Sequence, residues 1–503
     1  MSTDKTSLLH TTGAPVSSAN SAMKNAVAAA GKYRWTICAL LFFSTTINYL
    51  DRQVLSWIWK DYLVPEFHWT DSDYGTITSL FSIFYAVSML FAGRIVDWLD
   101  TRRGFIWAIG LWSIGACIHA FCGIATSGVL TGNWATGFAG AKESIQTVGN
   151  ISTVVSTSVM FFVIARLVLA IGEAGNFPAA IKTTAEFFPK KDRAFSTSIW
   201  NAGATVGALA APVTIPYIAK AWGWEMAFIF IGAFGFIWMG FWIFMYKKPH
   251  LHPKVNKAEL EYIQQDIVTH DQVSEPVIAA EKKMSFASCF RYKQTWAFAF
   301  GKFMTDGVWW FFLFWTPAYL KDIYKMDSTQ SSIPILVLYA ITLLSVIGGW
   351  LPTYFVEKKG MNPYEGRMRA MLIFAFFPLL TLLAQPLGSY SYWVPVVIIG
   401  IAGAAHQSWS ANIFSTVGDM FPKTAIATVT GIGGMAGGVG SFLINKGSGM
   451  LFTYSGETQM RLMGFQGKEA GYFIIFSICA VAYLIGWFVM KSLVPVYKPI
   501  TAE

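Results

Sequence analysis

The feature that most constrains this chain is a series of apolar blocks, each long enough to cross a lipid bilayer as a helix. A spanning helix needs about 20 mostly apolar residues, and about twelve blocks reach that length. Backbone polar groups in lipid must bond within their own segment, so such blocks form helices. The expected helices begin near Trp35, Tyr74, Phe105, Ser158, Ala194, Trp224, Thr295, Ile333, Met368, Trp393, Ala425 and Gly471. The sequence therefore predicts an all-α polytopic membrane protein with twelve transmembrane helices in two six-helix bundles.

Composition and charge agree with this prediction. The 503 residues are 54% hydrophobic and 13% charged, whereas soluble globular chains carry about 25% charged residues. The tails and the even-numbered loops hold 26 of the 37 Lys and Arg residues, and the opposite loops hold 8. This asymmetry predicts that both termini lie in the cytoplasm. The net charge of +9 is thus a topology signal, and we expect no nucleic-acid partner.

A polar, basic segment after the sixth block separates two halves of six helices. We expect a disordered cytoplasmic tail at 1–33, an N-terminal bundle at 34–246, a cytoplasmic linker at 247–293, a C-terminal bundle at 294–492 and a cytoplasmic tail at 493–503. A second long loop, 123–156, is expected on the outer face, and its sequence indicates no role.

The two halves repeat each other at low similarity. "GEAGNFPAAIKTTAEFFPK", in and after the fourth helix, resembles "GAAHQSWSANIFSTVGDMFPK" in the tenth. A shift of 233 residues places Glu186 on Asp419 and Phe188 on Phe421, each phenylalanine being followed by Pro-Lys. Helices six apart run in the same direction, so the repeat axis lies along the membrane normal. That arrangement belongs to transporters whose site lies near the midplane, between the halves.

Charged residues interrupt the apolar blocks at three places. A charge in hydrocarbon costs about 3 kcal/mol or more, so each is expected to face the bundle interior with a partner. Residues four apart on a helix are neighbours, which predicts a direct ion pair between Lys302 and Asp306. The seven-residue spacing of Arg166 and Glu173 puts both on one helix face, about 10.5 Å apart. The interior charges are Asp51, Arg52, Arg166, Glu173, Lys302 and Asp306.

The three interior cations and three interior anions sum to zero. A bound carboxylate would make this sum −1, and one bound proton would return it to zero. The charge balance is therefore a physical motive for carrying an acid together with a proton.

The segment "GRIVDWLDTRRG", residues 93–104, joins the second and third helices. Through Gly93, Asp97, Arg102 and Arg103 it resembles the signature loop of the major facilitator superfamily, although Trp98 stands where that loop often has a base. Gly93 would allow close helix approach, and Asp97 would face the positive N-terminal end of the eleventh helix. The resemblance implies a latch that gates the cytoplasmic face; an ordinary basic loop is the alternative.

Nearly the whole chain is similar to one branch of that superfamily. The segments "NYLDRQ", "ARLVLAIGEAGNFPA", "GKFMTDGVWWFFLFWTPAYL" and "GAAHQSWSANIF" resemble the anion:cation symporter family. "HQSWSAN", "FPKTAIATVTGIGGMAGG" and "GGWLP" are most similar to its hexuronate transporters. The long external loop after the third helix is an addition to the shorter members.

The resemblance implies roles for the interior charges. Arg52, whose planar fork suits a carboxylate, is assigned to the carboxylate of the substrate, and Asp51 and Glu173 to proton coupling. Arg166 is expected either to pair with Asp51 or to help hold the anion. The ion pair between Lys302 and Asp306 is expected to act in gating, with a direct role in function left open.

A sugar acid also needs hydrogen-bond partners for its hydroxyl groups and an apolar face for its ring. His406 aligns with Glu173 in the repeat, so it is either a proton relay or a hydrogen-bonded interior histidine. Aromatic residues at helical spacing, such as Trp309, are more often packing than site. The expected substrate-binding residues are Tyr49, Arg52, Tyr85, Arg166, Asn201, Trp310, Gln407, Trp409 and Asn412.

These features predict a secondary active transporter and no enzyme, since the sequence has no nucleophile set, metal-ligand spacing or nucleotide loop. We expect import of a hexuronate, glucuronate or galacturonate, by proton symport with alternating access. The alternatives are another carboxylate symporter, for instance for aldonates or aldarates, and an organic-anion exchanger; a receptor without transport is disfavoured. We expect no cofactor or metal, a monomer, and a multi-pass location in a bacterial inner membrane.

Overall fold

The computed structural model describes residues 31–134, 137–271 and 286–500, and these are almost entirely helical. Most of the expected N-terminal tail, residues 1–30, lies outside the described residues. The fold is that of an all-α polytopic membrane protein, as predicted, with one small β-hairpin.

The first half consists of long helices with short elements between them. Its long helices are α2 (Tyr33–Ile58), α4 (Asp71–Ala120), α7 (Ile151–Glu173), α8 (Asn176–Phe187), α9 (Lys190–Trp222) and α10 (Trp224–Met245). Its short elements are a π-helix (Trp59–Leu63), α3 (Val64–Phe67), α5 (Cys122–Thr131) and α6 (Gly137–Gln146). The linker contributes a 3-10 turn (Pro249–Leu251), α11 (Lys257–Asp271) and α12 (Phe286–Cys289).

Helix α4 contains the second and third expected spans in one run, broken at Asp100. This residue has φ 69°, ψ 154°, and positive φ is uncommon outside glycine. The break reverses the chain at the loop that the sequence marks as a family motif.

At the start of α4, a side-chain capping box formed by Thr70 and Asp73 fixes where the helix begins.

The second half has the same plan. Its helices are α13 (Lys293–Tyr324), α14 (Ser332–Thr342), α15 (Ile347–Lys359), α16 (Pro363–Phe376), α17 (Ala384–Gly388), α18 (Trp393–Met420), α19 (Lys423–Glu457) and α20 (Lys468–Leu493). The 3-10 turns Leu343–Val346 and Phe377–Leu383 join α14 to α15 and α16 to α17. Strands β1 (Arg461–Leu462) and β2 (Phe465–Gln466) pair antiparallel between α19 and α20.

Eight helical segments of the described chain are long and apolar enough to cross a membrane, and a pair bent by 51° adds a ninth. Helices α2, α13 and α19 complete the twelve expected from the sequence. These three are less apolar because α2 and α13 carry interior charges and α19 is rich in glycine. The helices that fail a simple hydropathy test thus include the ones that carry the expected site.

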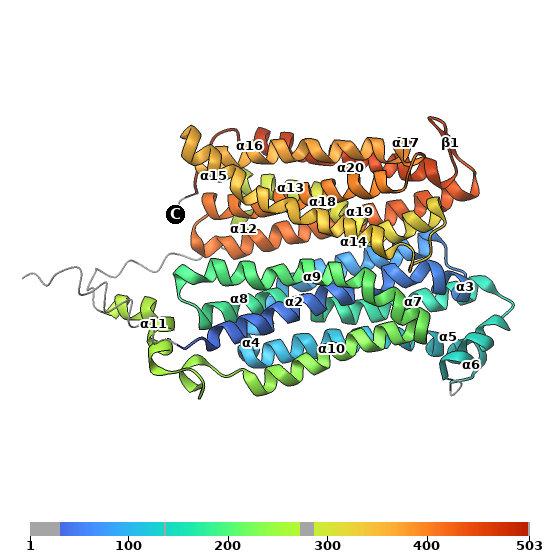
Figure 1. Cartoon of the computed structure of the whole chain (residues 1–503), viewed down its shortest axis with the longest axis horizontal. Helices are drawn as coiled ribbons and strands as arrows, with labels where there is room; N and C mark the ends of the chain where they lie inside the picture. The colour runs from blue at the N-terminus through green and yellow to red at the C-terminus, as the bar shows by residue number, and fades with distance from the viewer. Residues whose placement is uncertain (1–30, 135–136, 272–285, 501–503) are drawn as a thin grey trace, which may run out of the picture.

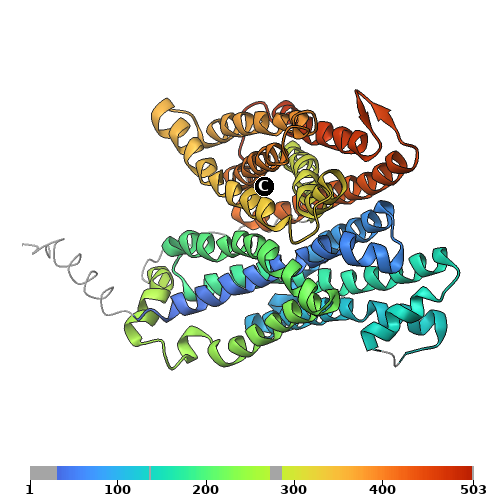
Figure 2. The ribbon, with the colours of Figure 1, turned by 45° about the vertical axis from the view of Figure 1, so that its right-hand side comes forward.

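The two halves form two bundles that lie side by side (Figure 1). Both ends of the described chain and α11 lie at one end of the bundles, which we call the linker end. Strand β1, α3, α5 and α6 lie at the other, which we call the hairpin end. The bundles meet mainly where α4 packs on α19 and α9 on α14, and Figure 2 shows the same division from a second side.

The α4–α19 contact is close because small residues line it. A Cβ atom on Gly75 would lie 2.8 Å from the carbonyl oxygen of Asn445 and 2.9 Å from the Cα of Gly449. Farther along the same contact, the hydroxyl groups of Ser82 and Ser441 are 2.9 Å apart. Small residues let membrane helices approach in this way, which holds the halves together toward the hairpin end.

Candidate functional site

Arg52 lies in α2 at the interface of the two halves, and its partner is Glu173 at the end of α7. Its Nε and Nη2 atoms donate hydrogen bonds of 3.0 and 2.7 Å to the same oxygen, Glu173 Oε2. The side chains are only 4% and 0% exposed. Removal of either partner would leave the other as an uncompensated buried charge, which is strongly destabilising. Glu173 Oε1 has no hydrogen-bond partner among the described residues.

Aromatic rings surround the Arg52 guanidinium. The Cζ atom is 4.6 Å from the ring centroid of Tyr85 and 5.1 Å from that of Tyr49. It is also 5.1 Å from the ring of Trp310, which belongs to α13 of the second half, and 5.9 Å from Phe81. Aromatic faces attract a cation at these distances. The structure thus gathers Tyr49, Arg52, Tyr85 and Trp310, four of the expected substrate-binding residues, at one place between the halves.

Asp51 and Arg166 lie behind this place, inside the first bundle. Successive residues of a helix point about 100° apart, so Asp51 lies on a different side of α2 from Arg52. Both Asp51 oxygens, and Nε and Nη1 of Arg166, are buried without a hydrogen-bond partner among the described residues. The two side chains form no ion pair with each other, so this alternative for Arg166 is wrong as a direct contact. The Arg166 guanidinium lies 5.1 Å from the ring of Phe81 instead.

The remaining ion pair of the interior is on α13. Lys302 Nζ lies 2.8 Å from Asp306 Oδ1, with the side chains 6% and 15% exposed. The contact has the i to i+4 geometry that the sequence predicts.

Three of the expected substrate residues are less well placed. Trp409 is fully buried, with its ring against Tyr483 at 5.5 Å, because its face of α18 packs into the second bundle. Asn412 uses its amide nitrogen on the carbonyls of Gly348 and Ser408, both at 2.8 Å. Asn201 is exposed on α9. The prediction that Trp409 contacts the substrate directly is therefore wrong in this conformation. Gln407, also on α18, is half-buried.

His406 has the surroundings of an interior histidine held by its neighbours. Its Nδ1 atom lies 2.7 Å from the hydroxyl of Tyr483. Its ring stacks on Trp309, with centroids 5.3 Å apart and planes 2° apart. These contacts fit the hydrogen-bonded alternative and give His406 no contact with Arg52 or Glu173.

The family-motif loop lies at the linker end and is bound within its own half. Arg102 Nη2 donates to the carbonyl of Ile243, at 2.6 Å, and Arg103 is exposed. A Cβ on Gly93 would meet only the Cβ of Pro178, at 4.0 Å, so the expected need for glycine at a close helix contact is wrong here. The Asp97 side chain, and with it the expected latch to α19, lies outside what the structure describes.

The repeat-related acids Glu186 and Asp419 both brace this end. Thr101 Oγ1 donates to Glu186 Oε1 at 2.6 Å, and the Tyr246 hydroxyl donates to Glu186 Oε2. Burial and the Glu186 carboxylate raise the pKa of Tyr246. In the second half, Arg367 Nε donates to Asp419 Oδ2 at 2.6 Å.

A charge network that sequence reasoning missed joins the halves at the hairpin end. Lys60 lies 2.6 Å from Asp71 and 3.0 Å from Asp322. Lys468 lies 2.5 Å from Asp71 and 3.4 Å from Asp322. The four contacts close a ring in which lysine and aspartate alternate, and two of them, Lys60–Asp322 and Lys468–Asp71, join the first half to the second. We call Lys60, Asp71, Asp322 and Lys468 the hairpin-end network.

A second pair adds to this closure. Lys321 Nζ lies 2.8 Å from Asp61 Oδ1. A signal for these contacts was present in the sequence, because a Lys-Asp dipeptide lies near the end of the first long helical segment of each half. It is at 60–61, in the π-helix that follows α2, and at 321–322, in the last turn of α13. Further hydrogen bonds between the halves join Gln53 to Tyr339, Tyr74 to Phe314, Thr76 to Lys446 and Ser82 to Ser441.

Glu66 of α3 is a buried acid beside α5 and α6 at the hairpin end. The indole of Trp224 donates to its Oε2 at 2.9 Å. Burial raises the pKa of Glu66 to about 7, against the lowering effect of this hydrogen bond. The nearby Glu225 also raises it, and Lys142 of α6 lowers it.

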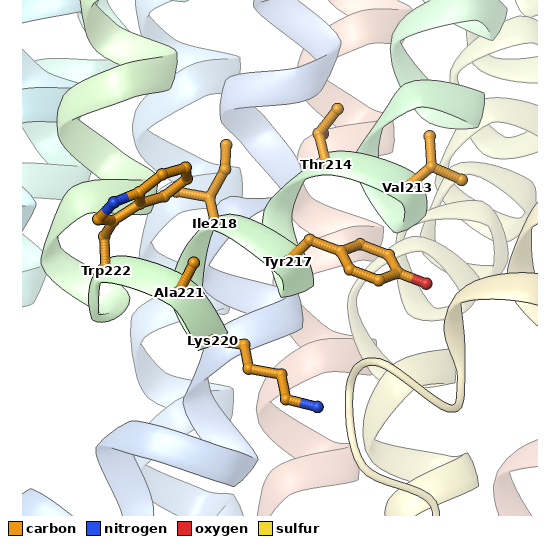
Figure 3. Close-up of a pocket in the computed structure, with 7 residues that line it drawn as sticks. All are labelled: Val213, Thr214, Tyr217, Ile218, Lys220, Ala221 and Trp222. Atoms are coloured by element: carbon orange, nitrogen blue, oxygen red, sulfur yellow. The ribbon is translucent and has the colours of Figure 1, made fainter.

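A groove on α9 is unrelated to this site. Its lining residues come from one stretch of α9 near the hairpin end, and Figure 3 shows their side chains spreading in different directions and not converging on one point. They are Val213, Thr214, Tyr217, Ile218, Lys220, Ala221 and Trp222. The groove is mostly apolar, and its polar side chains, Thr214, Tyr217 and Lys220, do not converge on a point where they could bind a sugar acid together.

Comparison with known proteins gives a family and a set of relatives. The model of the family described as "Major Facilitator Superfamily" matches residues 41–445. The chain is 26% identical to the hexuronate transporter of Escherichia coli (strain K12) over 471 residues, which cover 91% of this chain and 94% of that protein. It is 25% identical to the galacturonate transporter of Dickeya chrysanthemi, over 65% of this chain and 84% of that protein. It is 23% identical to a probable galactarate/D-glucarate transporter of E. coli K12, over 82% and 86%.

Solved structures agree on the fold. An inward-facing, occupied bacterial homologue of the human lysosomal transporter Spinster superposes with a TM-score of 0.66 at 18% identity, over 94% of this chain and all of that one. A D-xylose–proton symporter superposes with a TM-score of 0.64 at 15% identity, over 93% and 98%.

Proposed function

Because this chain belongs to the major facilitator superfamily, we propose that it is a proton symporter that imports a hexuronate by alternating access. Its relatives are transporters named for hexuronate, galacturonate and galactarate. The observation that carries the proposal is the hydrogen-bonded pair of Arg52 and Glu173, buried where the two halves meet.

Glu173 occupies the edge of Arg52 that a substrate carboxylate would use. An arginine binds a carboxylate through two parallel N–H donors, and here Nε and Nη2 are both turned to Glu173. Proton binding would neutralise Glu173 and weaken its hold on Arg52. The guanidinium would then be free for the substrate carboxylate, so proton and anion would bind together. This competition is the physical basis that we propose for symport.

Asp51 is the second candidate for a proton site. Its carboxylate is buried inside the first bundle without a hydrogen-bond partner among the described residues, so no donor there competes with a proton for its oxygens. The rings of Tyr85 and Trp310 beside Arg52 would support the apolar face of a sugar ring, and the hydroxyl of Tyr85 would bond to its hydroxyl groups.

We propose that the chain lies in a bacterial inner membrane with its linker end and both termini in the cytoplasm; the excess of Lys and Arg in the tails and even-numbered loops supports this orientation. The hairpin end then faces outward. The hairpin-end network and the α4–α19 contact would close the outer side in this conformation. Import requires that these contacts break when the protein opens outward, and we propose a monomer as the functional unit.

The test is uptake of radiolabelled glucuronate and galacturonate into proteoliposomes that hold the purified chain. With the vesicle interior alkaline, we expect accumulation above the external concentration, which a protonophore abolishes. Unlabelled hexuronate should compete, and glucose should not. Accumulation that ignores the pH gradient, or equal inhibition by glucose, would reject the proposal. Uptake only in exchange for an internal anion would favour an organic-anion exchanger.

A further inference from the structure

One face of α13 carries Lys302, Asp306 and Trp310 in steps of four residues. A four-residue step advances a helix by about 6 Å on the same face. Trp310 lies against Arg52, with 5.1 Å between ring centroid and Cζ. The ion pair of Lys302 and Asp306 therefore begins about one turn from the proposed carboxylate site, along the face of α13 that the first half contacts.

Helix α19 places Asp306 beside the site independently. A Cβ on Gly437 would overlap the carboxylate of Asp306, so the glycine leaves the room that this side chain occupies. The next residue, Gly438, lies against Ala86 of α4. Ala86 follows Tyr85, whose ring is 4.6 Å from the Arg52 guanidinium. Asp306 thus lies at the contact between halves, near the level of the aromatic rings around Arg52.

The pair is electrically neutral and only partly shielded. Lys302 Nζ is 2.8 Å from Asp306 Oδ1, and Asp306 is the more exposed partner at 15%. The ammonium also lies 4.3 Å from the ring of Phe414. Both charges belong to α13, so their contact does not itself tie one half to the other, and it fits a gate less well than the hairpin-end network does.

We propose that this pair recognises the end of the substrate remote from the carboxylate that Arg52 binds, and that it excludes a second carboxylate. The inference rests on the proposed function. Terminal carbons of an extended six-carbon acid are roughly 6 Å apart, given bonds near 1.5 Å, which matches one turn of α13. Asp306 would accept hydrogen bonds from the hydroxyl-bearing end of a hexuronate or an aldonate.

An aldarate carries a carboxylate at both ends. Its second carboxylate would meet Asp306, a like charge, or would have to displace Asp306 from Lys302 and leave a part-buried acid unpaired. Specificity often comes from such a repulsive element. The acid of the pair therefore selects monocarboxylates, and the lysine keeps that acid from standing alone.

The experiment measures ligand-induced thermal stabilisation of the purified full-length protein, titrated with glucuronate, galactonate and glucarate. For the wild type we expect glucuronate to bind on the order of ten-fold or more tightly than glucarate. Asp306→Asn frees Lys302 for a second carboxylate, so this ratio should fall on the order of ten-fold. Lys302→Gln leaves Asp306 alone, so glucarate should weaken further relative to glucuronate. The two variants must move the ratio in opposite directions.

Asp419→Asn is the matched control, because Asp419 is also the acid of an ion pair but lies at the linker end with Arg367. It should leave the ratio unchanged. If Asp306→Asn does not fold, Lys302→Gln and the double variant Lys302→Gln/Asp306→Asn decide, since the double variant should discriminate less than Lys302→Gln.

The outcomes separate this inference from the proposed function. A wild type that binds none of the three acids contradicts the proposed function itself. A wild type that binds glucuronate, with a ratio that both single variants leave unchanged or shift in the same direction, overturns the role of the pair alone. Preferred binding of glucarate by the wild type also overturns it, and leaves a carboxylate symporter.

Discussion

Arg52 donates two hydrogen bonds to one oxygen of Glu173, so the arginine and the acid proposed for substrate and proton are each other's partners. They come from α2 and α7 and meet at the interface of the halves. A change to either residue therefore affects the other, and experiments on this pair need readouts that separate binding from coupling.

Replacement of Arg52 by lysine tests the fork. Lysine keeps the charge but offers no planar pair of donors. We expect Arg52→Lys to fold and to lose roughly 10-fold or more in affinity for the acid, as when a bidentate contact becomes a single one. Binding would be measured by titration of thermal stability, with Arg367→Lys as the control arginine. Wild-type affinity in Arg52→Lys would remove this residue from the site.

Glu173→Gln separates carrying from coupling. The amide resembles the protonated acid, so Arg52 should stay available to substrate and exchange of labelled for unlabelled hexuronate should persist. Uphill uptake driven by a pH gradient should be lost, because the variant cannot release a proton. Both are measured in the same vesicles, with Glu186→Gln as the control. Undiminished accumulation with the normal pH dependence would exclude Glu173 as the coupling acid and direct attention to Asp51.

The number and order of helices could be predicted from the sequence, because a membrane-spanning helix is recognised by its length and its apolar composition. The i to i+4 spacing of Lys302 and Asp306 was enough to predict their contact, since local helix geometry fixes it. The partner of Glu173 was not predictable in this way. Arg166 shares a face of α7 with Glu173, but Glu173 bonds to Arg52 on α2, and the packing of α2 against α7, which local sequence does not reveal, decides that choice.

The hairpin-end network shows the same limit. Its four residues lie near helix ends that are far apart in the sequence, and each read alone is an ordinary loop charge. Only the repeated Lys-Asp dipeptide at 60–61 and 321–322 hinted that the two halves use equivalent positions. For Trp409 the sequence predicted a contact that the structure lacks. The motif around it resembles that of the family, but its indole is buried in the core of the second bundle.

The hairpin-end network predicts a conformational bias. Lys468→Ala removes one of its two cations and leaves Asp71 and Asp322 to share Lys60. Loss of about 1 kcal/mol would raise an outward-open population roughly five-fold. The measure is labelling of Ser82→Cys, in a background free of the five native cysteines, by a membrane-impermeant maleimide added outside. Ser82 is buried between α4 and α19 in the closed state, so labelling should rise.

Lys220→Ala is the control for this measurement, because Lys220 lies on the α9 groove near the hairpin end and outside the network. Unchanged labelling in Lys468→Ala would show that the network does not hold the halves together. Increased labelling only from the opposite side of the membrane would contradict the orientation that we propose.

The last prediction concerns Glu66, whose pKa burial raises to about 7. In an unfolded chain a glutamate titrates near pH 4.3, so between these values the folded state binds more protons than the unfolded state. Stability should therefore be complete below the lower pKa and should fall as pH rises through about 7, by up to about 3 kcal/mol. Thermal melting from pH 5 to pH 8 measures this loss.

Glu66→Gln keeps the shape and an acceptor for Trp224 without the charge, so it should flatten that part of the profile and melt higher at pH 8. The control Glu225→Gln changes a neighbouring acid that takes no hydrogen bond from Trp224 and should keep most of the slope. A Glu66→Gln profile parallel to that of the wild type would show that Glu66 does not titrate in this range.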